Sequence, residues 1–187
     1  MSQYEVMFAG FGGQGIMTAG QLLSYTAINE GKQVAWIPSY GPEMRGGTAY
    51  CTVVVSDSRI GSPIINNPRG ICVFNLPSLT KFAPKVKPGG LLIINSSLID
   101  ETSDRKDILV LRVPANDIAL KAGSAKVTNM VVLGAFVGVT GVVSFEKLKD
   151  TLKQKLGHKQ KLLEINFVAI EEGHKIGLKA KEEKAKV

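Results

Sequence analysis

Four glycines within the first fifteen residues form the most distinctive chemical feature of the sequence. Gly10, Gly12 and Gly15 have the spacing G-x-G-x-x-G, and they lie between an apolar segment and a segment with helical periodicity. Glycines at these positions allow a tight turn, and free N–H groups at the start of a helix attract phosphate. The pattern predicts either a phosphate-binding loop or a tight turn that packs a helix against a strand without a ligand.

The segment after this loop does not favour a conventional NAD site. Such a site usually has an acidic residue near the end of the second strand, where the carboxylate binds the ribose hydroxyls. Residues 33–41 contain no acid, and the first acid beyond them is Glu43. The glycine spacing alone therefore does not identify the ligand.

A second glycine-rich loop covers residues 39–48, and its sequence is SYGPEMRGGT. Arg45 could hold a phosphate or a carboxylate, or it could pair with Glu43 and brace the loop. Ligands of open α/β sheets bind at the carboxyl ends of the strands, so we expect both loops to open onto the same edge. A loop of this kind could equally be a docking surface for another subunit.

Few other residues suggest catalysis. The two histidines, His158 and His174, lie in the C-terminal segment, remote from both loops, and no nucleophile elbow, Walker lysine or zinc motif is present. Cys51 and Cys72 fall in apolar runs, which is typical of buried, inert thiols. A 4Fe-4S cluster normally needs four thiolates, so two cysteines cannot hold one. We expect neither a metal site nor independent catalytic machinery.

The elements expected to position the loops alternate between strands and helices. The first forty residues predict a strand, a helix over 14–30 that stops at Gly31, and a second strand. A further strand is expected over 49–55, followed by a turn at 57–61 into another short one. Continuous apolar runs, typical of parallel strands with helices on both faces, cover residues 71–75, 91–95 and 108–113. The fold class is therefore α/β, with a mostly parallel sheet flanked by helices, a Rossmann-like start and a hairpin-like insertion.

The C-terminal part predicts three helices. Residues 128–140 are apolar on all sides and should be buried throughout, whereas Ser144 should cap a helix with one apolar stripe. Gly134 and Gly138 would allow a second backbone to approach, either within this chain or from a partner subunit. A last helix is expected over 159–173. We predict a single α/β domain over residues 1–178 and a charged tail over 179–187 that frays.

The composition fits a cytoplasmic globular protein that binds neither nucleic acid nor membrane. Apolar residues make up 44% and charged residues 21%, which is ordinary globular usage. The net charge is +7, but the lysines beyond Ser144 alternate with leucines and glutamates, as on a solvated helix face. Residues 1–10 lack the pattern of a signal peptide, and the longest apolar run, 130–139, is too short to span a bilayer.

The two loops together resemble a known family. Residues 10–20, GFGGQGIMTAG, and residues 37–48, IPSYGPEMRGGT, are similar to the gamma subunit of 2-oxoacid:ferredoxin oxidoreductases. The likeness continues through residues 60–63 and through Thr128 and Asn129, so it covers nearly the whole chain.

The resemblance implies an oxidoreductase subunit that is inactive alone. Such enzymes convert a 2-oxoacid and coenzyme A to an acyl-CoA, CO2 and reduced ferredoxin. Thiamine diphosphate, Mg and 4Fe-4S clusters would reside in the partner subunits, alpha, beta and in some enzymes delta, and this chain would hold none of them. The residues implied to bind coenzyme A are Gly12, Gly13, Gln14, Gly15, Thr18 and Asn129. Those implied to face a partner or the active site are Tyr40, Gly41, Pro42, Glu43, Arg45 and Gly46.

The resemblance favours 2-oxoglutarate as the substrate. The second loop looks closer to the 2-oxoglutarate and branched-chain versions, and residues 47–49 count against pyruvate. Branched-chain 2-oxoacids and pyruvate stay open as alternatives. A free-standing nucleotide-binding protein of Rossmann-like fold and a purely structural scaffold are the rival functions.

Overall fold

The computed structural model describes residues 3–41 and 48–185. Its centre is one six-stranded sheet with the strand order β2-β3-β1-β4-β5-β6. The strands are β1 (Gln3–Phe11), β2 (Gln33–Tyr40), β3 (Thr48–Ser56), β4 (Gly70–Val73), β5 (Leu91–Asn95) and β6 (Leu109–Val113).

The sheet is parallel over β1, β4, β5 and β6 and antiparallel at the other edge. β3 pairs with β1 and with β2 in antiparallel register, with Phe11 opposite Thr48 and Tyr40 opposite Ala49. The hairpin of the structure is β2–β3, with β3 between β1 and β2, whereas the sequence predicted a hairpin of the strand 49–55 with a further strand beyond residues 57–61. The prediction of a further strand beyond the turn at 57–61 was wrong, since residues 57–69 contain only bends and irregular backbone.

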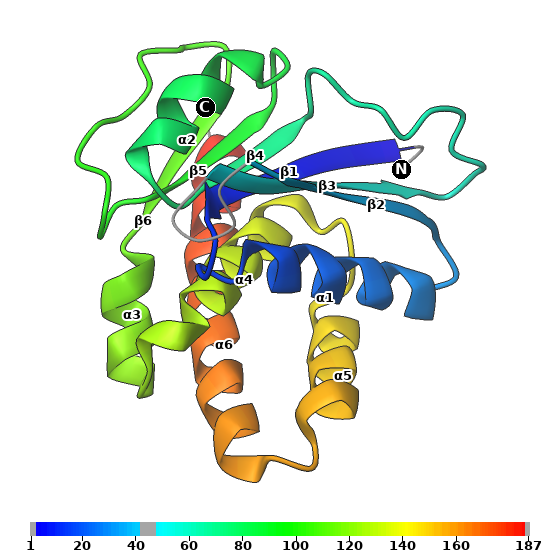
Figure 1. Ribbon diagram of the computed structural model, residues 1–187, viewed down its shortest axis with the longest axis vertical. Coiled ribbons are helices and arrows are strands. Elements are labelled where there is room, and N and C mark those ends of the chain that lie inside the picture. Colours follow the sequence, from blue (N-terminus) through cyan, green and yellow to red (C-terminus); the bar gives the residue numbers. More distant parts are fainter. Residues whose placement is uncertain (1–2, 42–47, 186–187) are drawn as a thin grey trace.

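Helices cover both faces of the sheet (Figure 1). One face carries α1 (Ile16–Asn29), α4 (Thr128–Thr140), α5 (Phe145–Leu156) and α6 (Gln160–Ala185), with α3 (Ala115–Ala122) alongside. The other face carries α2 (Leu76–Phe82) and the short 3-10 helix Ala83–Lys85. Successive strand residues point to opposite faces, so Phe8 packs under the first set of helices and Met7 under the second. The predicted α/β class, with helices flanking a mostly parallel sheet, is confirmed.

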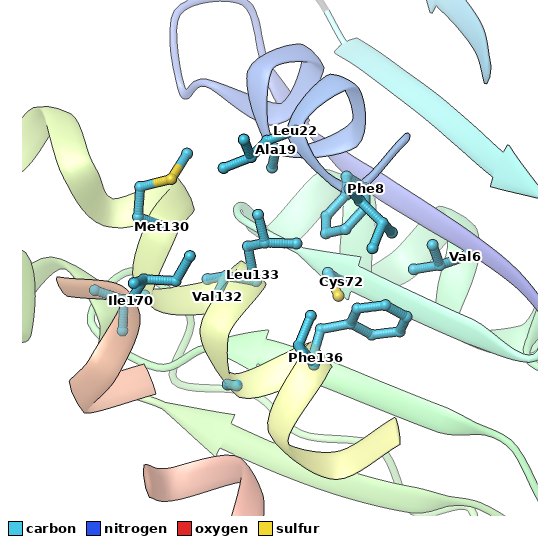
Figure 2. Packing of buried hydrophobic residues seen from close by; sticks show 14 of the residues in the cluster. Val6, Phe8, Ala19, Leu22, Cys72, Met130, Val132, Leu133, Phe136 and Ile170 are labelled. Carbon is cyan, nitrogen blue, oxygen red and sulfur yellow. The ribbon is translucent and has the colours of Figure 1, made fainter. Parts of the chain in front are cut away.

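Aromatic and aliphatic side chains from β1, β4 and α4 fill the larger half of the core (Figure 2). The Phe136 ring meets the Phe8 ring edge to face, with the ring centroids 5.9 Å apart. Both cysteines are fully buried, and burial raises the pKa of the Cys51 thiol to about 12. The α4 helix is buried from Thr128 to Gly138, which confirms the prediction of a helix without a solvent face.

Helices α4 and α6 pack backbone against backbone. A Cβ added at Gly134 would lie 2.1 Å from the Ile170 carbonyl oxygen, and one at Gly173 would lie 2.0 Å from that of Val131. Of the two alternatives for Gly134 and Gly138, close approach within this chain is therefore the correct one. Contact with α4 continues beyond Gly173 to Gly177 and Leu178, so α6 does not end at Gly173 as the sequence predicted. The helix extends to Ala185, where the sequence predicted a frayed tail.

Two helix starts differ from the prediction. The α1 helix begins at Ile16, later than the expected residue 14, because Gly15 has a left-handed conformation with φ 75°. Ser144 stands at the N-cap of α5, but its side chain makes no capping hydrogen bond, and its N–H donates to Glu30 instead. No helix in the described ranges is long and apolar enough to cross a membrane.

Candidate functional site

The glycine loop joins the end of β1 to the start of α1 in the order that the sequence predicted. Gly13 has φ 98° and Gly15 has φ 75°, conformations that residues with a side chain rarely adopt. Gly15 is the N-cap of α1, no side chain caps the helix, and its first turn contains no acid. The first N–H groups of α1 therefore leave a positively polarised helix end, which favours an anion.

A shallow cavity of ≈ 380 Å³ opens at this helix start. Its walls come from the glycine loop, from the first turn of α1 and from the facing ends of β2 and β3. The residues that line it are Gly12, Gly13, Gly15, Ile16, Met17, Thr18, Tyr40 and Ala49. The expectation that both loops open onto one edge of the sheet is confirmed for their described parts. Tyr40 is the only residue of this described lining with an ionisable side chain.

Gln14 is not among the residues that line this cavity, and its side chain forms hydrogen bonds within the protein. Its Oε1 atom accepts from the Phe11 N–H at 2.6 Å and from the Asn75 amide at 3.4 Å. Its Nε2 donates to the Phe74 carbonyl oxygen at 3.2 Å. Gln14 therefore ties the glycine loop to the carboxyl end of β4.

Asn129 supports the glycine loop from the start of α4. Its Nδ2 donates to the Gly15 carbonyl oxygen at 3.0 Å, and the side chain is almost fully buried. A Cβ at Gly15 would lie 2.6 Å from that nitrogen, so the contact also requires glycine. The sequence placed Asn129 near this edge, and its position there is confirmed.

The predicted site residues thus divide into three groups. Gly12, Gly13, Gly15, Thr18 and Tyr40 line the cavity. Gln14 and Asn129 hold the glycine loop, while Gly41 donates its N–H to Thr48 across the hairpin. The predictions for Pro42, Glu43, Arg45 and Gly46 lie outside the described residues.

Sequence reasoning missed three lining residues, Ile16, Met17 and Ala49. Ile16 and Met17 follow the loop directly, so the helix start could have signalled them. Ala49 could not be found this way, because its place depends on the antiparallel pairing of β2 with β3.

In the part of the chain that the structure describes, the other residue types that could serve in catalysis or metal binding do not form a second site. The His174 ring stacks on the Phe145 ring with centroids 3.7 Å apart, so this histidine packs α6 against α5. Over residues 3–41 and 48–185, no three His, Cys, Asp or Glu side chains are placed to share a metal ion.

Comparison with known proteins places the chain in a family. The family model described as pyruvate ferredoxin/flavodoxin oxidoreductase matches residues 5–176. The chain belongs to this family. Within it the chain is of the gamma-subunit type, as the resemblance of its two loops indicated.

Curated relatives carry several substrate names. The ketoisovalerate oxidoreductase subunit VorA of Methanothermobacter marburgensis is 37% identical over 173 residues, which cover 91% of this chain and 36% of the relative. The chain thus spans about a third of the length of that relative. The 2-oxoglutarate synthase subunit KorC of the same organism is 33% identical over 181 residues, covering 92% of this chain and 95% of the relative.

A solved structure has the same fold over nearly the whole chain. The gamma subunit of a keto/oxoacid ferredoxin oxidoreductase from Geobacter sulfurreducens PCA superimposes with a TM-score of 0.85 at 29% identity. The match covers 96% of this chain and 99% of the other.

Proposed function

We propose that the chain is an accessory gamma subunit of a 2-oxoacid:ferredoxin oxidoreductase and contributes to coenzyme A binding and complex assembly. The complete enzyme would convert a 2-oxoacid and coenzyme A to an acyl-CoA, CO2 and reduced ferredoxin. Alpha and beta subunits, and in some complexes a delta subunit, would carry thiamine diphosphate, Mg and the 4Fe-4S clusters. The family membership and the full-length likeness to a gamma subunit support this role.

The observation that carries the coenzyme A proposal is the open start of α1. Its N–H groups have no side-chain cap, its first turn has no acid, and a cavity of ≈ 380 Å³ lies in front of it. The coenzyme A diphosphate is an anion that such a helix end would stabilise. Gly12, Gly13 and Gly15 would bring the backbone close to it, and Thr18 would lie beside it in the first turn.

A matched pair of substitutions at Thr18 tests this proposal in the assembled complex. Thr18 is exposed at the cavity, so Thr18→Glu and Thr18→Gln differ in charge and little in shape. We expect Thr18→Glu to raise the Michaelis constant for coenzyme A by about tenfold, since about 1.4 kcal/mol of repulsion corresponds to that factor. Thr18→Gln should stay near the unsubstituted value.

Thr18→Glu should not lower the stability of the fold, because an acid in the first turn stabilises a helix. A melting temperature that is unchanged or higher, together with weaker coenzyme A binding, separates a ligand effect from a folding effect. Equal Michaelis constants for the Glu and Gln complexes would contradict a coenzyme A site at this cavity.

The second loop is proposed to face a partner subunit or the active site. β2 ends at Tyr40 beside the cavity, and the sequence continues through Gly41, Pro42, Glu43, Arg45 and Gly46. Arg45→Ala should lower the activity of the complex and change the unfolding free energy of the isolated chain by less than about 1 kcal/mol, as for surface positions. A large loss of melting temperature in the isolated chain would instead assign Arg45 to bracing the fold.

Two substrates have specific support. The second-loop sequence favours 2-oxoglutarate, and the KorC relative matches this chain over nearly its full length. A branched-chain 2-oxoacid is favoured by the higher identity to the VorA relative. Assaying the purified complex with 2-oxoglutarate, ketoisovalerate and pyruvate, and comparing kcat/KM, decides between them.

Recovery of the complex is the first experiment. The tagged chain should co-purify under anaerobic conditions with larger subunits that contain thiamine diphosphate and iron–sulfur clusters. Recovery of the chain alone, with tight binding of NADH in a fluorescence titration, would support the rival nucleotide-binding function instead.

A further inference from the structure

A glutamine side chain lies in the crevice where open α/β sheets usually bind ligands. That crevice lies at the switch point, where neighbouring strands send their connections to opposite faces of the sheet. Here the neighbours are β1 and β4: β1 leads to α1 on one face, and β4 leads to α2 on the other (Figure 1). The Gln14 side chain lies between these two connections.

Three hydrogen bonds hold Gln14 in this position. Two of them use backbone groups at the ends of both strands, the Phe11 N–H and the Phe74 carbonyl oxygen, and the third comes from Asn75. The amide lies close to the Gly10 backbone, since a Cβ at Gly10 would lie 2.5 Å from the Gln14 Oε1 atom. The half-buried side chain thus links two segments that are sixty residues apart in the sequence.

The cavity lies on the other side of the glycine loop, toward the β2–β3 hairpin. Its lining includes Tyr40 and Ala49 from the hairpin but not Gln14, Phe74 or Asn75. Gly13 and Gly15, both with positive φ, line this cavity together with the first turn of α1.

We infer that Gln14 is a positioning residue: it lies in the β1–β4 crevice and fixes the glycine loop so that the ligand is bound on the hairpin side. The inference rests on the proposed coenzyme A function and adds how the site is oriented. Gln14 acts through the backbone of residues 11–15 and does not itself contact the ligand.

Two substitutions of Gln14 in the assembled complex test the inference. Gln14→Met keeps most of the side-chain volume and removes the hydrogen bonds, whereas Gln14→Ala removes both. We expect each to raise the Michaelis constant for coenzyme A by about 3- to 10-fold, the effect of losing one or two net hydrogen bonds. The kcat value should stay within about twofold, and the melting temperature should fall by no more than about 4 °C. Gln33→Met, the same chemical change at the exposed start of β2, is the control. It should leave the Michaelis constant for coenzyme A, the kcat value and the melting temperature unchanged.

An unchanged Michaelis constant in Gln14→Met would overturn the inference, because it would show that the hydrogen bonds do not orient the site. Failure of both variants to fold would also overturn it, since Gln14 would then be a residue that the fold requires. The Thr18 pair separates this failure from failure of the proposed function. If Thr18→Glu raises the Michaelis constant for coenzyme A and Gln14→Met does not, only the positioning role of Gln14 is contradicted.

Discussion

Glycine has different roles in the α4–α6 contact and in the loop between β1 and α1. In the helix pair, Gly134, Gly138, Gly173 and Gly177 have ordinary helical conformations, and each needs to be glycine because the facing backbone leaves no space for a Cβ. In the loop, Gly13 has φ 98°, and a Cβ there would meet nothing within 4 Å. The helix glycines are constrained by volume, Gly13 by backbone torsion alone, and Gly15 by both, since a Cβ there would also meet Asn129. A glycine-rich sequence therefore does not by itself indicate a ligand site.

The largest predicted effect tests the volume constraint. Gly173→Ala would place a Cβ 2.0 Å from the Val131 carbonyl oxygen, so the two helices must separate. We expect the unfolding free energy to fall by about 3 kcal/mol or more, at the upper end for overpacked sites. Urea unfolding of the full chain measures this loss. Gly61→Ala is the matched control, since a Cβ at Gly61 meets nothing within 4 Å, and it should change stability by less than about 0.5 kcal/mol.

The next effect tests the torsional constraint. Gly13→Ala has room for the methyl group but requires a conformation that alanine resists. We expect a loss of about 1–2 kcal/mol in unfolding free energy, the usual cost of a left-handed residue with a Cβ. Asparagine tolerates such conformations better, so Gly13→Asn should lose less. A loss at Gly13 as large as that at Gly173 would remove the distinction between the two regions.

The smallest expected effect is a pH dependence of stability, which should arise in α6 and not in the glycine loop. Burial lowers the pKa of His174 below its usual 6.5, with a weaker opposing effect of Glu146. The folded state therefore favours the neutral imidazole, and the stability that this gives is present above pH 6.5 and is lost as the pH falls through the folded pKa. We expect the melting temperature to decrease between pH 7 and pH 5 less in His174→Gln than in the unsubstituted chain. An identical pH dependence in both proteins would show that His174 does not contribute.

Much of the α/β architecture could be predicted because its signals are local. Continuous apolar runs located β4, β5 and β6, and the glycine spacing located the β1–α1 turn together with its open helix start. The position of β3 between β1 and β2 could not be predicted, since strand pairing depends on the whole sheet and not on the alternation within one segment. The cavity wall at Ala49 was missed for the same reason.

The error at α6 has a physical cause of another kind. Gly173 resembles a helix stop in the sequence, yet in the structure it lies mid-helix against α4. Nothing within the segment 159–173 reveals that a second helix faces it. Gln14 is a comparable case: the sequence placed it in the ligand loop, but only the fold brings Phe74 and Asn75 within hydrogen-bonding distance.

Residues near both ends of the described chain lie at the sheet edge opposite the glycine loop. Tyr4, near the start of β1, and Lys184, near the end of α6, line one small cavity beside Gly90 and Leu91, where β5 begins. The residues that line the cavity at the start of α1 all lie between positions 12 and 49. Sequence joined near either end of the described chain would therefore begin away from this cavity, so the fold is suited to act as a module within longer chains. The much greater length of the VorA relative is consistent with such modular use of the fold.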